Sequence, residues 1–196
     1  IFQPSASVQN RETREEISDR ILALAISAGQ VWMATNNGLL KFDTKMGAWN
    51  WYRQETGLIS DQISSLGIKG NTIWIGAVHG LSKFGTVSGK WKNYKQEKTL
   101  PSADVLAIGE DAEGVWLATA KAVSRFTPDT ERWKTYTNED GLGGGTVTCL
   151  DVVGNYVWIG SDQGISRLDK SNATWEHFRA AKSGLVADEI TAIRVD

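Results

Sequence analysis

Eight of the nine tryptophans in this chain of 196 residues follow a spacing of 42 residues, and this spacing constrains the fold more than any other feature. The first set of tryptophans comprises Trp32, Trp74, Trp116 and Trp158, and the second set comprises Trp49, Trp91, Trp133 and Trp175. Internal repeats of about 40 to 50 residues are typical of propeller blades or of helical arrays. The content of each repeat decides between these two architectures.

Each repeat contains four short runs of strand-forming residues. In successive copies the second run reads VWMAT, IWIGA, VWLAT and VWIGS, and the third reads GLLKF, GLSKF, AVSRF and GISRL. Turn residues such as Gly70-Asn71 separate the runs, and helical periodicity is absent. The sequence therefore predicts an all-β fold, a β-propeller built of four-stranded antiparallel blades, with about four full blades and one extra strand.

The repeat also predicts where the blades begin and end. We expect a non-repeat segment at 1–18, blades at 19–60, 61–102, 103–144 and 145–187, and the first strand of a further blade at 188–196. In that last segment, Ile190, Ile193 and Val195 match the first run of the other repeats. Three explanations remain open: a piece of a longer chain, a small ring that closes irregularly, or two copies that form one larger ring.

The tryptophans of the repeat are expected to fill the gaps between blades, where each would bury about 150–250 Å². Trp51 falls outside the pattern, because its counterparts are Asn93, Thr135 and His177, and we expect it to be exposed. The bases Lys41, Lys83, Arg125 and Arg167 recur at the same period, and we expect them to reach the rim.

Composition excludes several classes of protein. A net charge of −2 argues against a nucleic-acid surface. A single cysteine, Cys149, excludes an internal disulfide framework. The sequence contains no stretch of eighteen apolar residues, so no direct membrane insertion is expected in this segment.

The repeat resembles a known bacterial repeat. The run ISSLGIKGNTIWIGAVHGLSKF from Ile63, followed by Trp91 and Tyr94, and the loop Gly57–Asp61 of the form GLxxD look like the two-component regulator propeller repeat. The resemblance covers about residues 19 to 196. It implies a propeller in the extracytoplasmic region (periplasmic or cell surface) of a bacterial sensor, ahead of a transmembrane helix and a histidine kinase. Some such sensors respond to oligosaccharides. This chain carries fewer repeats than those sensors, and neither a membrane segment nor a kinase.

Candidate binding residues lie in the loops at one edge of the blades. In an up-and-down sheet, the loop from strand two to strand three shares an edge with the loop that leads to the next blade. Function usually lies on such variable loops. The candidates in the first kind of loop are Asn36, Asn37, His79, Lys121, Asp162 and Gln163, and those in the second are Asp61, Asp104 and Asp188. They are expected to ring the entrance of a central channel.

Signals for catalysis are weak. The two histidines, His79 and His177, have no metal-ligand spacing, and Cys149 has no partner for a zinc site. The glycines of 141–145 do not open a helix after a strand, as a phosphate cradle requires. We therefore expect no catalytic residue, no metal and no cofactor.

These observations favour a non-enzymatic propeller that senses or recognises a carbohydrate or another small ligand. The alternative is a structural or protein-interaction propeller in a larger assembly, which binds a protein partner or self-associates through its unpaired C-terminal strand. A third hypothesis, a lyase or hydrolase, requires a cluster of histidine and carboxylate at the channel mouth, to which only His79 could contribute.

Overall fold

The computed structural model describes residues 20–95, 102 and 104–195, and these residues form four antiparallel four-stranded sheets. The predicted non-repeat segment 1–18 lies outside the described residues. We call the sheets blades 1 to 4. They comprise β1 (Ile21–Ser27), β2 (Gln30–Thr35), β3 (Gly38–Asp43) and β4 (Ala48–Tyr52); β5 (Ile63–Lys69), β6 (Thr72–Ala77), β7 (Gly80–Gly85) and β8 (Trp91–Lys95); β9 (Ala107–Glu110), β10 (Val115–Thr119), β11 (Ala122–Thr127) and β12 (Arg132–Tyr136); and β13 (Val147–Val153), β14 (Tyr156–Ser161), β15 (Gly164–Asp169) and β16 (Thr174–Phe178).

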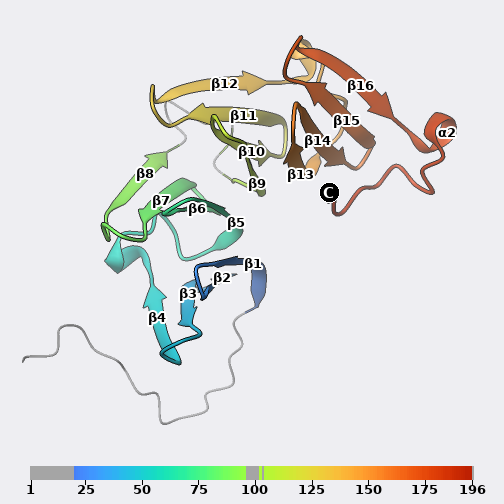
Figure 1. Cartoon of the computed structure of the whole chain (residues 1–196). Helices are drawn as coiled ribbons and strands as arrows, with labels where there is room; N and C mark the ends of the chain where they lie inside the picture. The colour runs from blue at the N-terminus through green and yellow to red at the C-terminus, as the bar shows by residue number, and fades with distance from the viewer. Residues whose placement is uncertain (1–19, 96–101, 103, 196) are drawn as a thin grey trace, which may run out of the picture.

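The blades follow one another around an arc, with β1, β5, β9 and β13 on its inner side and β4, β8, β12 and β16 outermost (Figure 1). Neighbouring inner strands contact each other, β1 with β5, β5 with β9, and β9 with β13. The predicted propeller of four-stranded blades is confirmed. Within the described residues the arc is open, because blade 4 lies far from blade 1 (Figure 1).

The tryptophans of the second strands join each blade to the next, as the repeat predicts. Trp32, Trp74 and Trp116 are at most 1% exposed. The ring of Trp32 meets Phe84 of blade 2 at 5.9 Å between centroids, and the ring of Trp74 meets Phe126 of blade 3 at 5.6 Å. Second strands are apolar at successive positions because both of their faces are covered, one by each neighbouring blade.

The recurring bases were expected to reach the rim, but in the structure they lie against tryptophan rings. Lys41, Lys83, Arg125 and Arg167 each lie over the tryptophan that pairs with them across the strands, at 5.2–5.6 Å from the ring centroid. The physical reason is the register, because a cation held over an indole ring is attracted by its π-face and also covers the ring.

Residues 188–195 differ from the prediction of an extra strand. They contain no regular β-strand, because a first strand pairs with the second strand of its own blade, and no such strand follows among the described residues. The segment instead lies along blade 4. The backbone N–H of Ile190 donates to the carbonyl oxygen of Ser161 at 2.9 Å, and the hydroxyl of Thr148 donates to the carbonyl oxygen of Ile190.

Helical structure is short throughout the described residues. The 3₁₀ helices η1 (Gln54–Thr56) and η2 (Asn138–Asp140) lie between blades, and the α-helix α2 (Ala180–Ser183) follows blade 4. None of these helices has the length and apolar character needed to cross a membrane.

Candidate functional site

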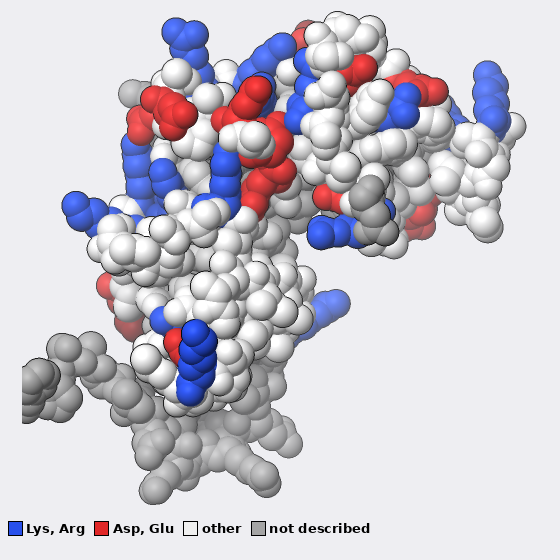
Figure 2. All heavy atoms as spheres, viewed as in Figure 1, with Lys and Arg blue, Asp and Glu red and all other residues white. Residues whose placement is uncertain are grey.

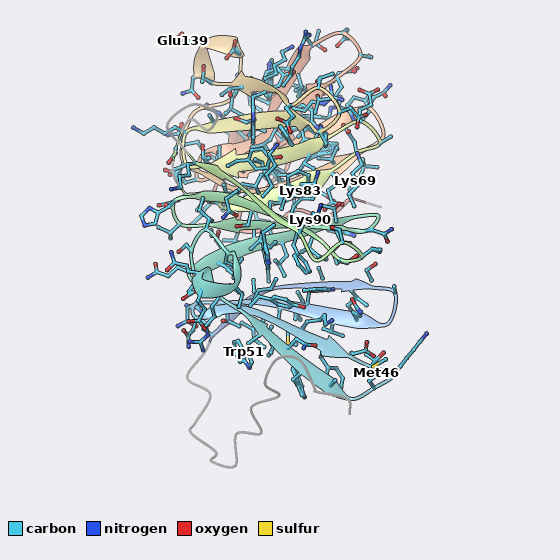
Figure 3. All side chains as sticks on the ribbon, turned by 90° about the vertical axis from the view of Figure 1, so that its left-hand side faces the viewer. Met46, Trp51, Lys69, Lys83, Lys90 and Glu139 are labelled. Carbon is cyan, nitrogen blue, oxygen red and sulfur yellow. The ribbon has the colours of Figure 1, made fainter. Side chains whose placement is uncertain are left out.

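The candidate residues lie on one rim of the arc, where the loops between second and third strands meet the loops between blades. In Figure 3, Glu139 marks this rim on the left, and Met46, in the turn between β3 and β4, marks the opposite rim on the right. Figure 2 shows the opposite rim, where Lys and Arg are interspersed with Asp and Glu and form no single basic patch on that face.

A hollow of about 430 Å³ opens on the candidate rim between blades 1 and 2. It brings together four of the nine predicted residues, Asn36, Asn37, Asp61 and His79. The rest of its lining consists of Gln54, Ser60, Gln62 and Val78. Gln54 and Ser60 were not predicted. They lie in η1 and in the loop that follows it, and the sequence of the repeat does not indicate that this segment folds back onto the blade.

Hydrogen bonds to the backbone hold the wall of this hollow. Asn36 Oδ1 accepts the backbone N–H of Arg20 at 2.7 Å, and Asp61 Oδ1 accepts that of Gln54 at 2.8 Å. Gln54 Nε2 in turn donates to the carbonyl oxygen of Ile59 at 2.9 Å. Asp61 therefore fixes the loop that carries it, and Asn36 ties its loop to the chain that leads into β1, as preformed binding sites require.

Other polar groups in the hollow are free to meet a ligand. Among the described residues, the side chains of Gln62 and His79 have no hydrogen-bond partner, and the amide nitrogen of Asn36 has none. Together with the second carboxylate oxygen of Asp61, they offer both donors and acceptors.

His79 has an unusual backbone conformation, with a φ of +77°, which few non-glycine residues adopt. Gly80 follows with a φ of +139°, and a Cβ there would lie 2.2 Å from the carbonyl oxygen of Tyr94. This tight turn presents the exposed imidazole at the hollow. Tight hairpin turns often require such a φ, as at Ala28, Glu131 and Ala173, so this conformation positions the imidazole without marking a ligand site.

A second hollow, of about 510 Å³, lies between blades 3 and 4 and is lined by Lys121, Thr137, Asn138, Glu139 and Gly145. It repeats the first hollow two blades later, since Lys121, Asn138 and Gly145 are the 84-residue counterparts of Asn37, Gln54 and Asp61. The first hollow contains four amide side chains, whereas the second contains only Asn138, together with Glu139 and with Lys121 in the place of Asn37.

The remaining predicted residues lie outside the linings of both hollows. Asp162 and Asp188 have the backbone roles of Asn36 and Asp61, since they accept the N–H groups of Thr146 at 2.9 Å and of Ala180 at 2.6 Å. Gln163 and Asp104 are exposed. Five of the nine predicted residues thus line two separate hollows, and the other four line neither.

The chemistry of these hollows is that of hydrogen bonding. In the described part of the chain, no group of three or more His, Cys, Asp and Glu side chains could hold a metal ion. The two strongly shifted carboxyl groups, Glu110 and Asp111, line neither hollow, and lie at the end of β9 and in the turn that follows it. An amide-rich hollow of this size suits a small polyhydroxylated molecule, which needs donors and acceptors at close spacing.

Comparisons with solved structures agree with the fold. The extracellular domain of the proposed one-component system BT4673 from B. thetaiotaomicron superposes with a TM-score of 0.75 at 20% identity, over 88% of this chain and 24% of that one. The extracellular domain of the proposed hybrid two-component system BT3049 from the same organism gives a TM-score of 0.71 at 15% identity, over 87% of this chain and 25% of that one.

Other folds of this kind also match. Virginiamycin B lyase from Staphylococcus aureus superposes with a TM-score of 0.63 at 18% identity, over 79% of this chain and 54% of that one. No family model matches the sequence, and no curated protein matches it. The resemblance to sensor propellers is thus confirmed in the fold, and this chain spans about a quarter of the length of the two sensor domains.

Proposed function

We propose that this chain is a non-enzymatic part of an extracytoplasmic bacterial sensor and that it recognises a small polyhydroxylated ligand, such as a neutral oligosaccharide. The observation that carries the proposal is the hollow between blades 1 and 2, where amide, carboxylate and imidazole groups converge on a preformed wall. The similarity in fold to extracellular domains of bacterial sensors supports the proposed location.

Different groups in the hollow can contact different parts of a ligand. Gln62 and the amide of Asn36 can each donate to a sugar hydroxyl, and Asp61 can accept from one. His79 and Val78 offer an imidazole and an apolar surface at the same hollow. None of these groups needs to move far, because the two loops are already tied to their blades.

A thermal-shift screen of the full chain against neutral oligosaccharides tests this proposal. A ligand present at 100 times its Kd stabilises a protein by about 2.7 kcal/mol, which corresponds to a rise in Tm of about 5–10 °C for a chain of this size. His79→Asn and Gln62→Ala should reduce the shift at equal sugar concentration. Asparagine tolerates the positive φ of residue 79, so the first variant keeps the turn.

Gln163→Ala is the matched control, because Gln163 is the 84-residue counterpart of His79 on blade 4 and lies outside both hollow linings. It should keep the full shift. If no neutral oligosaccharide raises Tm, or if all three variants respond alike, the proposal of recognition in this hollow fails.

A second candidate function is a structural or protein-interaction role. The observation that favours it is the apolar surface left at the two ends of the arc, where Leu24 and Ile26 of β1 are 61% and 75% exposed and Trp158 of β14 is only half-buried. A binding partner retained through gel filtration would support this role, and a monodisperse monomer that binds sugar would oppose it.

A further inference from the structure

Two of the three interfaces between blades, those between blades 1 and 2 and between blades 3 and 4, share a polar contact at equivalent positions of the repeat. Ser82 Oγ of blade 2 accepts the backbone N–H of Ile59 of blade 1 at 2.9 Å, and Ser166 Oγ of blade 4 accepts that of Gly143 at 3.1 Å. Each serine lies on the third strand of its blade and also bonds a polar residue on the fourth strand, Asn93 or His177. The serine hydroxyl thus accepts a hydrogen bond from the loop of the preceding blade.

Blade 1 lacks this receiving pair. At the positions of Ser82 and Asn93 it has Leu40 and Trp51, which are partners across β3 and β4. These two residues lie on the face of blade 1 that turns away from blade 2, since the ring of Trp32 occupies the other face. Trp51 is 38% exposed and projects from blade 1 in Figure 3. A preceding blade of this repeat would bring a backbone N–H against Leu40, which cannot accept it.

Blade 4 presents the other side of such an interface, namely the loop that would donate a backbone N–H to the serine of a following blade. Its loop residue Val186, the counterpart of Ile59, is fully exposed, and its backbone N–H has no partner among the described residues. Trp158 is half-buried, whereas its three counterparts in blades 1 to 3 are covered by the next blade. In the described part of the chain, this face therefore offers an unpaired backbone N–H and a partly exposed tryptophan, and no blade packs against it.

The C-terminal segment already lies where the inner strand of a next blade would lie. The hydroxyl of Thr148 donates to the carbonyl oxygen of Ile190, as that of Ser64 donates to the carbonyl oxygen of Val105. A Cβ built on Gly160 would lie 2.6 Å from Ile190, and one built on Gly76 would lie 2.7 Å from Val105. The contacts of blade 4 with this segment thus copy those of blade 2 with the start of blade 3.

We propose that the free face of blade 4 binds the second to fourth strands of a further blade of this repeat, with residues 188–195 as its inner strand, and that a serine on the third strand selects that blade. Blade 1 of a second copy does not fit there, because it offers Leu40 and Trp51 where the Val186 N–H needs an acceptor, and because its own β1 would compete with residues 188–195.

An extended chain tests this proposal. Asp188 corresponds to Asp61, so Asp196 corresponds to Lys69, and residues 70–95, which contain β6 to β8, can follow Asp196 in register. One extension keeps Ser82 and Asn93, and the matched control carries Ser82→Leu and Asn93→Trp in the added copy. The serine extension should raise Tm and slow amide exchange at Val186 by about tenfold or more, and the control should lose most of both effects.

Two results would overturn the proposal. The first is a serine extension that leaves Tm and Val186 exchange unchanged, or a control that protects Val186 equally well. The second is head-to-tail association of the unextended chain in sedimentation experiments, shown by its loss in a Leu24→Lys variant of blade 1 and in a Val186→Glu variant of blade 4. A chain that stays monomeric at high concentration agrees with the exclusion of blade 1.

Discussion

Ser82 Oγ in blade 2 accepts the backbone N–H of Ile59 in blade 1 at 2.9 Å, in a buried position. The same oxygen lies 2.7 Å from Asn93 Oδ1. The hydroxyl therefore accepts from one blade and donates within the other. Because Ser82 and Ile59 are both buried, removal of the hydroxyl leaves the backbone N–H of Ile59 buried and unpaired.

Ser82→Ala should therefore destabilise the fold by about 1–3 kcal/mol in urea unfolding. Ser88→Ala provides the control, because Ser88 Oγ makes an exposed contact with the N–H of Lys90 at 3.3 Å. The control should change the free energy of unfolding by less than about 0.5 kcal/mol. Equal changes in the free energy of unfolding would show that the interface hydrogen bond stabilises the fold no more than an exposed one.

The ion pair between Asp111 and Lys170 joins blade 3 to blade 4, with Asp111 Oδ2 2.7 Å from Lys170 Nζ. Trp116 Nε1 also donates to this oxygen at 2.9 Å, whereas Nε1 of Trp32 and of Trp74 is buried without a partner. Asp111→Ala should cost about 1.5–3 kcal/mol, because it removes hydrogen bonds to a charged group from the partly buried Lys170 ammonium and from the buried Nε1 of Trp116. Glu131→Ala, which breaks the exposed pair with Lys92, should destabilise the protein much less.

The Asp111 carboxyl also predicts how the protein responds to acid. Burial disfavours its charged form, but hydrogen bonds from Lys170, Trp116 and the backbone of Glu113 outweigh burial and hold its pKa at about 2. Since this value lies below the usual 3.8, the stabilisation is complete above about pH 4 and is lost as the pH falls through about 2. Asp111→Asn should flatten that part of an acid unfolding curve followed by circular dichroism.

Glu110 should have the opposite pH dependence. It takes the position of Ile26, Ile68 and Val152 in β9, and its carboxylate lies against Gly67 of blade 2. Burial raises its pKa to about 7, and Lys69 only partly offsets this effect. The folded state therefore binds a proton more tightly than the unfolded state.

Stability from Glu110 should then be present below about pH 4.5 and be lost as the pH rises through about 7, with a slope of at most about 1.4 kcal/mol per pH unit. Glu110→Gln should reduce the fall in Tm between pH 5 and pH 8. A wild-type Tm that rises over this range, with an unchanged slope in the variant, would contradict the assignment.

Trp116 and Trp158 occupy equivalent positions but should differ in how much they contribute to the free energy of unfolding. Trp116 is fully buried between blades 3 and 4, so Trp116→Ala should cost about 3–5 kcal/mol. Trp158 is half-buried, so Trp158→Ala should cost clearly less in this chain. Comparison of the two variants by urea unfolding checks whether the second free energy change is the smaller one.

The fold could be predicted from the sequence because the tryptophan spacing and the strand runs are local patterns that recur. The register is known only from the structure, in which Trp32 and Lys41 pair across β2 and β3. The position of Lys41 over the indole of Trp32 was not predicted, because a lysine over an indole and a lysine at a rim have the same spacing in sequence.

The candidate site was only partly predictable. Loop position alone identified Asn36 and His79, but Gln54 reaches the hollow only because η1 folds back, and its amide bonds the carbonyl oxygen of Ile59. Likewise, nothing in a loop sequence distinguishes Asp61, which lines the hollow, from Asp188, which makes the same backbone bond outside it. These differences arise from contacts between blades that no single repeat contains.

Sugar recognition in the first hollow is tested most directly by titration of the full ¹⁵N-labelled chain with the neutral oligosaccharide that raises Tm most, monitored by amide chemical shifts. Recognition between blades 1 and 2 predicts the largest shifts at Asn36, Gln62 and His79, with small shifts at Lys121 and Glu139 of the second hollow. Shifts centred on the second hollow, or none at saturating sugar, would contradict recognition between blades 1 and 2.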